Sequence, residues 1–175
     1  ALKRALDFWS QQQSTKAKTF FKQALDVIHK STITCLRISD FNTSGLVGSR
    51  EEYNSPWCNL TKSSGASDKS GSHGGSFGIG KFAPYACSSL RTVFYSTSDK
   101  DGLCASQGVS RLTSFKSKKN EITQGTGFYG NDKNSPMYKQ FSLDPAYSRS
   151  AENSGTDIFI AAFNGDKGWQ HQMVA

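Results

Sequence analysis

The spacing of the apolar residues changes once along this chain, and that change limits the folds open to it. Over the first thirty residues the apolar positions recur every three to four residues, which is the period of an amphipathic helix. A first helix is predicted by Leu2, Ala5, Leu6 and Trp9. After Ser14, a residue type that caps helix N-termini, the same period continues from residue 17 to residue 30 and predicts a second helix. Beyond this point the apolar residues follow the pattern of strands.

Five segments of alternating or β-branched apolar residues are predicted strands, at residues 32–39, 91–98, 103–115, 122–129 and 156–163. Turn-forming residues, such as the Asp-Lys-Asp-Gly run at 99–102, separate the later segments, so most connections have hairpin length. Helices followed by a block of hairpin-connected strands are typical of an α+β fold. We therefore expect a two-layer α/β sandwich with helices packed on one face of a mostly antiparallel sheet.

The composition fits one packed domain. Of the 175 residues, 35% are hydrophobic and 12 are Phe, which is enough for a core. No apolar run approaches the roughly 20 residues that cross a bilayer. The 4 cysteines form no Cys-x-x-Cys pair, so we expect reduced thiols and a cytoplasmic location. The chain has no signal peptide and does not begin with Met, so we expect residues 1–175 to be a single domain cut from a larger intracellular protein.

A long polar stretch lies between the first two predicted strands. Residues 47–73 consist mainly of Ser, Gly, Lys, Asp and Asn, and loops of this length inside a domain commonly act as lids. They lead into a glycine run at residues 75–80, which Lys81 follows. Pro84 suits the first turn of a helix, so we expect a helix to begin near Gly80.

This glycine run has three interpretations. Residues 75–81 match the Walker A pattern G-x-x-x-x-G-K, but Phe82 stands where the magnesium-binding Ser or Thr belongs, and no strand leads into the run. A tight turn without a ligand is the second interpretation. The third is a phosphate cradle, because glycines let backbone N–H groups approach an anion and Lys81 adds a positive charge. The candidate phosphate-binding residues are Gly75, Ser76, Phe77, Gly78, Ile79, Gly80 and Lys81.

Two further landmarks flank the lid and the glycine run. Asp40 ends the first predicted strand and is followed by Asn42 and Gly45, while Gly155 and Thr156 open the last strand. An Asp-Gly motif, a lid, a glycine run and a late Gly-Thr pair, in this order, resemble the GHKL ATPases. These proteins have the Bergerat fold, a histidine kinase-like ATPase fold, and include gyrase B subunits, the ninety-kilodalton heat-shock chaperones, histidine kinases, MutL and the MORC proteins.

The resemblance covers about residues 1–163 and implies a site for an adenine nucleotide. It implies that Asp40 accepts a hydrogen bond from the adenine amino group, in whose place guanine has a carbonyl. It also implies that Gly45 lets the chain pass close to the nucleotide, that the glycine run and Lys81 surround the phosphates, and that Thr156 hydrogen-bonds near the adenine. The alternatives are that Asp40 is an ordinary turn residue at a strand end and that Thr156 is a plain strand residue.

Two departures from the family pattern concern the turn and the catalysis. The usual Asp-x-Gly-x-Gly motif has Asn42 in place of its first glycine, and Asn tolerates the positive φ that such a turn needs. The family places a catalytic Glu and a magnesium-binding Asn on its first helix, and here no Glu precedes Glu51. We therefore expect the Mg²⁺ ligand upstream of Ala1 and leave the catalytic residues unassigned. In the intact protein, ATP is expected to be hydrolysed and to act as a conformational switch, with ATP-dependent homodimerisation.

The net charge of +7 supports a second hypothesis, a basic nucleic-acid-binding module without a nucleotide site. Tyr129, Tyr138 and Tyr147 are candidates for stacking on bases, although the chain has no RRM, KH or helix-turn-helix signature. The lysine cluster at residues 116–119 is better explained as the solvated end of a hairpin.

Overall fold

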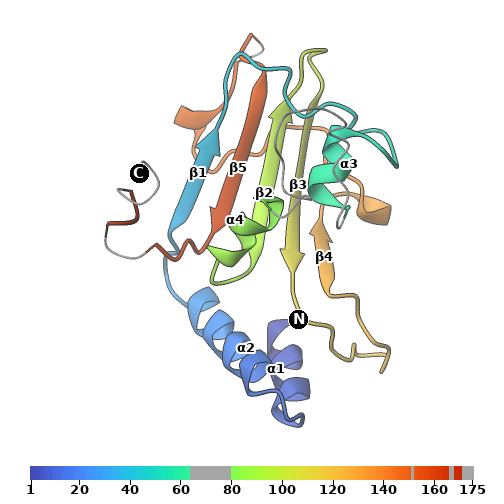
Figure 1. Cartoon of the computed structure of the whole chain (residues 1–175), viewed down its shortest axis with the longest axis vertical. Coiled ribbons are helices and arrows are strands. Elements are labelled where there is room, and N and C mark those ends of the chain that lie inside the picture. Colours follow the sequence, from blue (N-terminus) through green and yellow to red (C-terminus); the bar gives the residue numbers. More distant parts are fainter. Residues whose placement is uncertain (64–79, 151, 166–167, 171–175) are drawn as a thin grey trace.

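The computed structural model describes residues 1–63, 80–150, 152–165 and 168–170. Within these residues the chain forms a five-stranded antiparallel sheet with the strand order β1-β5-β2-β3-β4 (Figure 1). The strands are β1 (Cys35–Ser39), β2 (Thr92–Ser98), β3 (Cys104–Arg111), β4 (Thr126–Tyr129) and β5 (Gly155–Ala161). The predicted α+β class with an antiparallel sheet is confirmed.

The last strand of the sequence, β5, lies between the first two, β1 and β2. Ser39 of β1 and Ser96 of β2 both pair with Asp157 of β5. The end of β1 therefore lies beside the start of β5, and residues from opposite ends of the chain become neighbours.

Helices α3 (Pro56–Thr61) and α4 (Ala83–Ala86) lie on one face of the sheet (Figure 1). A 3₁₀ turn at Gly80–Phe82 precedes α4, so the helix predicted to begin near Gly80 starts as this tighter turn. The main hydrophobic core fills the space between this layer and the sheet. Its buried residues are Trp57, Cys58, Tyr85, Val93, Tyr95, Ala105 and Val109. The two-layer arrangement agrees with the sequence-based expectation.

Irregular chain after β4 covers the opposite face. Side chains alternate between the faces of a strand, so Phe94 of β2 and Phe159 of β5 point away from α3 and α4. The Phe141 ring stacks on Phe94 with the ring centroids 4.8 Å apart and meets Phe159 edge-on at 5.5 Å. The sheet is therefore packed on both faces.

Helices α1 (Leu2–Ser10) and α2 (Thr15–Ile28) form a hairpin at one end of the sheet rather than lying across its face (Figure 1). The hydroxyl of Ser14 accepts a hydrogen bond from the backbone N–H of Ala17, which confirms the predicted N-cap of the second helix. Both helices agree with the periodicity of the sequence.

The connection between β3 and β4, residues 112–125, contacts the helix hairpin. The Trp9 indole N–H donates to the carbonyl of Ser114 at 3.1 Å, and the ring of the fully buried Phe21 meets that of Phe115. Because this connection packs against the helices, β3 ends at Arg111 and β4 begins only at residue 126, so both strands are shorter than predicted.

Helix α3 lies inside the stretch for which the sequence predicts a lid over residues 47–73. Ser55 caps it by accepting from the N–H of Cys58 at 3.1 Å, and Pro56 occupies its first turn. Trp57 is fully buried in the core. The first part of the stretch is therefore a core element, and residues 64–73 lie outside the described residues. Among the described helices, none is long and apolar enough to cross a membrane.

Candidate functional site

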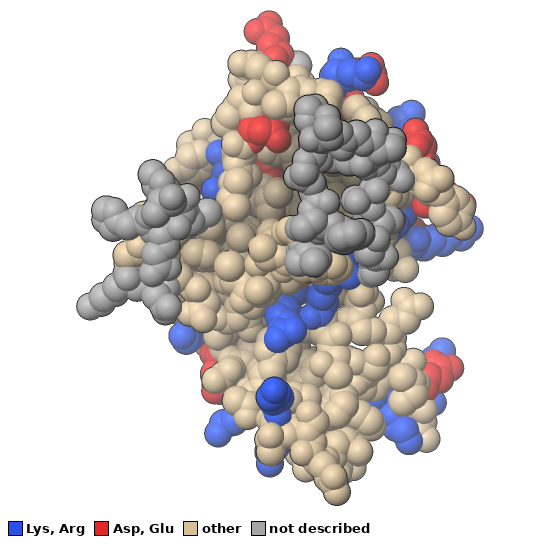
Figure 2. Space-filling view, viewed as in Figure 1, with Lys and Arg blue, Asp and Glu red and all other residues tan. Residues whose placement is uncertain are grey.

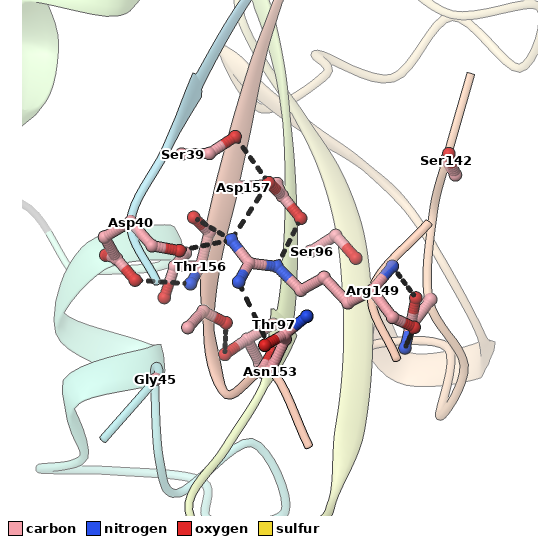
Figure 3. A network of polar contacts seen from close by, with 12 residues as sticks. Ser39, Asp40, Gly45, Ser96, Thr97, Ser142, Arg149, Asn153, Thr156 and Asp157 are labelled. Atoms are coloured by element: carbon pink, nitrogen blue, oxygen red, sulfur yellow. Dashed lines mark hydrogen bonds and ion pairs between the residues drawn. The ribbon is translucent and has the colours of Figure 1, made fainter. Parts of the chain in front are cut away.

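The structure brings Asp40 and Thr156 into contact where β1 ends and β5 begins (Figure 3). The backbone N–H of Thr156 donates to Oδ1 of Asp40 at 2.8 Å, and the backbone N–H of Asp40 donates to the carbonyl of Thr156 at 3.1 Å. The insertion of β5 beside β1 explains this meeting. Two of the three sequence landmarks therefore form one cluster.

The two carboxylate oxygens of Asp40 have different surroundings. Oδ1 accepts from Thr156 and also from the hydroxyl of Thr43 at 2.8 Å, which fixes the side chain. Oδ2 accepts no hydrogen bond from any described residue. The side chain of Asp40 is exposed, whereas the adenine-recognition hypothesis expects a buried acceptor, because Asp40 lies beyond the end of an edge strand. One oxygen thus holds the loop and the other can accept a donor from a ligand.

The turn after Asp40 has the backbone conformation that its residue types suggest. Asn42 adopts a positive φ of 56° and Gly45 one of 62°. A Cβ on Gly45 would lie 2.6 Å from the carbonyl oxygen of Ser98. The sequence predicts that Gly45 lets the chain pass close to a nucleotide. In the structure Gly45 passes close to the end of β2, so the fold itself requires a glycine there.

Gly155 is a second glycine that the fold requires. Its φ is 149°, and a Cβ would lie 2.6 Å from Oδ1 of Asp40 and 2.6 Å from Nη1 of Arg149. The Thr97 hydroxyl donates to the Gly155 carbonyl at 3.1 Å and accepts from the N–H of Leu46 at 2.8 Å. Thr97 thus ties the turn around Gly45 to the start of β5.

A buried ion pair between Arg149 and Asp157 supports the cluster from the opposite face of the sheet (Figure 3). Arg149 Nε donates to Asp157 Oδ2 at 2.7 Å and Nη2 donates to Oδ1 at 3.0 Å. Arg37 and the Ser39 hydroxyl donate to the same carboxylate. Burial alone would raise the pKa of Asp157, but hydrogen bonds from Arg149, Ser39 and Arg37 outweigh it, so the pKa lies below its usual value.

Arg149 extends from this ion pair to the contact between Asp40 and Thr156. Its Nη2 also donates to the carbonyls of Asp40 at 2.5 Å and Thr156 at 3.0 Å. The guanidinium lies 4.5 Å from the centroid of the Phe41 ring. Sequence reasoning missed this residue, and the signal that could have found it is Asp157, a single charge within the apolar strand that follows Gly155.

The phosphate-binding residues predicted from the glycine run fall into two groups. Gly75, Ser76, Phe77, Gly78 and Ile79 lie outside the described residues, so their role stays a prediction. Gly80 is exposed, and a Cβ there would meet no atom within 4 Å, so the described fold does not itself require a glycine. Lys81 donates from Nζ to the carbonyl of Asn59 at 2.9 Å, which links the residue after the glycine run to α3.

An apolar cleft of about 520 Å³ lies between α4 and the face of β1 and β5. It is lined by Leu36, Ile38, Gly80, Ala83, Pro84, Cys87, Ile160, Phe163, Asn164, Gly165 and Trp169. Its lining residue nearest to Asp40 in the sequence is Ile38, two residues before it, and neither Asp40 nor Thr156 is among the lining residues. The cleft therefore contains Gly80, at the end of the glycine run, and approaches Asp40 through Ile38.

The described residues contain no group of three or more His, Cys, Asp or Glu side chains that could hold a metal ion. Asp40 is the acidic residue of the cluster, and its Oδ1 is already engaged by Thr156 and Thr43. A Mg²⁺ ion that accompanies a nucleotide would need ligands from outside this set.

Comparisons of this chain with protein-family models, with curated proteins and with solved structures find no match. The candidate site therefore rests on its own geometry: the Asp40–Thr156 pair, the two required glycines and the apolar cleft.

Proposed function

We propose that this chain is an adenine-nucleotide-binding domain that resembles the GHKL ATPases and works as an ATP-dependent conformational switch in a larger protein. The observation that carries the proposal is the contact between Asp40 and Thr156. The resemblance gives both residues a role at the adenine, and they come together although they lie far apart in the sequence.

The cleft and Asp40 together suit adenine. Its aliphatic and aromatic lining offers apolar surface for a flat base, and its volume of about 520 Å³ is in the usual range of small-molecule sites. Oδ2 of Asp40 can accept a hydrogen bond from the exocyclic amino group of adenine. Guanine has a carbonyl oxygen at that position, which a carboxylate repels, so ATP is expected to bind more tightly than GTP.

The phosphates would extend from the cleft toward Gly80 and Lys81. Gly80 lines the cleft, and Lys81 is a cation next to it in the chain. In the proposed switch, ATP favours pairing of two copies, and bound Mg²⁺ would neutralise part of the phosphate charge.

Calorimetric titration of the chain with ATP and with GTP tests the proposal. The variant Asp40→Asn keeps an oxygen for the N–H of Thr156 but loses the negative acceptor, so ATP affinity should fall at least about tenfold. Asp132→Asn, at an exposed position outside the cluster, is the matched control and should bind ATP as the unaltered chain does. Absence of ATP binding, or equal ATP affinity in Asp40→Asn and the unaltered chain, would overturn the proposal.

One observation favours a nucleic-acid-binding module as the second candidate. Tyr129, Tyr138 and Tyr147 are 58%, 47% and 56% exposed, and Arg37 and Arg50 lie over the Tyr147 and Tyr138 rings. Exposed aromatic rings beside arginines can stack on bases. Binding of a single-stranded oligonucleotide should then weaken steeply as salt rises, whereas binding of ATP through the cleft should change much less.

A further inference from the structure

Arg111, at the end of β3, is half-buried, and its guanidinium forms no ion pair with a described residue. Its Nε and Nη2 atoms are buried and donate to no described residue. The guanidinium carbon lies 4.7 Å from the centroid of the Phe82 ring and 5.1 Å from that of the Tyr85 ring. The two aromatic rings therefore hold the group in place, while two of its donors have no acceptor in the part of the chain that the structure describes.

Arg149 shows what this pair of donors does elsewhere in the same molecule. The N–H bonds of Nε and Nη2 point in nearly the same direction, and in Arg149 they hold the two oxygens of Asp157 at 2.7 and 3.0 Å. Arg111 has the same two parallel donors. The ion pairs among the described residues join Asp157 to Arg37 and to Arg149, and neither involves Arg111. Among the described residues, no carboxylate or other acceptor faces this fork of donors.

An unpartnered pair of buried donors is costly unless a ligand supplies the acceptor. Arginine cannot lose its proton in a protein, and its nitrogens are donors only. Buried donors almost always have an acceptor, so the exceptions call for an explanation. The indole N–H of Trp57, in the same core cluster as Tyr85, is also buried and donates to no described residue.

Lys81 places a second positive charge close to Arg111. Its Nζ lies 5.8 Å from the centroid of the same Phe82 ring, while it donates to Asn59. Burial and the charge of Arg111 both lower the pKa of the Lys81 amino group. On the face of the molecule shown in Figure 2, basic side chains gather near the middle, above the hairpin of α1 and α2. Two neighbouring cations suit an anion that carries more than one negative charge.

We propose that Arg111 and Lys81 form a binding site for a phosphoryl group, in which Nε and Nη2 of Arg111 hold two phosphate oxygens. If the proposed function holds, the group is the terminal phosphate of the nucleotide, and Arg111 is a phosphate-binding residue beyond the glycine run. If it does not, the site takes a separate polyphosphate. The anion site itself rests only on the geometry around Arg111.

Titrations of the chain with inorganic triphosphate, ATP and adenosine at low ionic strength test this site. Arg111→Met keeps an apolar stem against Phe82 and Tyr85 but removes the charge and the fork. Triphosphate affinity should fall at least about tenfold in this variant. The thermal stability of the ligand-free variant should be unchanged or raised, because no buried charge is left unpaired. Arg91→Met is the matched control, since Arg91 is exposed and neighbours Arg111 through a backbone hydrogen bond.

The outcomes separate this site from the proposed function. If triphosphate binds the unaltered chain and Arg111→Met equally, or binds neither, the anion site is wrong, whatever adenosine does. If Arg111→Met alone loses both triphosphate and ATP while adenosine binding persists, the site takes the phosphate of the nucleotide. A third outcome is that Arg111→Met loses triphosphate binding, adenosine does not bind the unaltered chain, and Asp40→Asn leaves ATP affinity unchanged. In that case the anion site is supported and the adenine site is wrong.

Discussion

Oδ1 of Asp40 accepts a hydrogen bond from the backbone N–H of Thr156, a residue 116 positions later in the chain. The contact exists because β5 inserts between β1 and β2, so that the end of the first strand meets the start of the last. Arg149 holds the same two residues through their carbonyl oxygens. The contact between Asp40 and Thr156 is thus a product of the completed sheet, and anything that loosens β5 should weaken this contact.

Gly45→Ala should destabilise the chain more than Gly102→Ala. Both glycines have a positive φ, of 62° and 77°, so each substitution carries the left-handed strain of about 1–2 kcal/mol. At Gly45 the added Cβ would also meet the carbonyl oxygen of Ser98 at 2.6 Å, whereas at Gly102 it would meet nothing within 4 Å. Urea unfolding of the two variants measures the difference, and equal losses would contradict the packing of Gly45 against β2.

Asp157→Asn should lower the free energy of unfolding at neutral pH by about 3–5 kcal/mol, because it leaves Arg149 buried without its partner. The folded pKa of Asp157 lies below its usual value, so the carboxylate stabilises the fold above about pH 4 and loses this effect as pH falls further. The gap between variant and unaltered chain should therefore narrow in acid. Glu121→Gln, at an exposed carboxylate, is the control. A gap that stays constant down to pH 2–3 would contradict the role of this ion pair.

The sequence anticipated those parts of the site that depend on local backbone chemistry and on residue order. The positive φ of Asn42 follows from its residue type, and the strand-end positions of Asp40 and Thr156 follow from the alternation of apolar residues. Their direct contact needed one further fact, the insertion of β5 beside β1. Strand order depends on pairing between distant segments, and no local pattern encodes it.

Arg149 and Arg111 could not be found in this way. Each lies among polar or alternating residues, and its significance comes from what surrounds it after folding: Asp157 for one, and the Phe82 and Tyr85 rings for the other. Helix α3 was missed for a related reason, since it is only six residues long and lies within a polar stretch. Tertiary packing of a single tryptophan outweighs the composition of its neighbours.

Trp57→Ala should cost about 3–5 kcal/mol of stability, because it opens a cavity in the core beneath α3. Tyr53→Ala, four residues earlier and 79% exposed, should have a small effect. Thermal unfolding followed by circular dichroism compares the two. If residues 47–63 behaved as a detachable lid, both variants would unfold at nearly the same temperature as the unaltered chain, and the assignment of α3 to the core would be wrong.

Thr97→Val should destabilise the chain although valine has nearly the same shape as threonine. The hydroxyl of Thr97, which is 1% exposed, joins the N–H of Leu46 to the carbonyl of Gly155, and a methyl group can do neither. Each buried group left without a partner costs about 1–3 kcal/mol. Thr97→Ser keeps the hydroxyl and should recover most of the loss, while Thr126→Val, on the edge strand β4, should be nearly neutral.

Because Thr97 joins the turn around Gly45 to the start of β5, Thr97→Val should also weaken ATP binding when measured well below its unfolding midpoint. Equal urea midpoints for Thr97→Val and Thr97→Ser would show that this hydroxyl does not hold the two segments together.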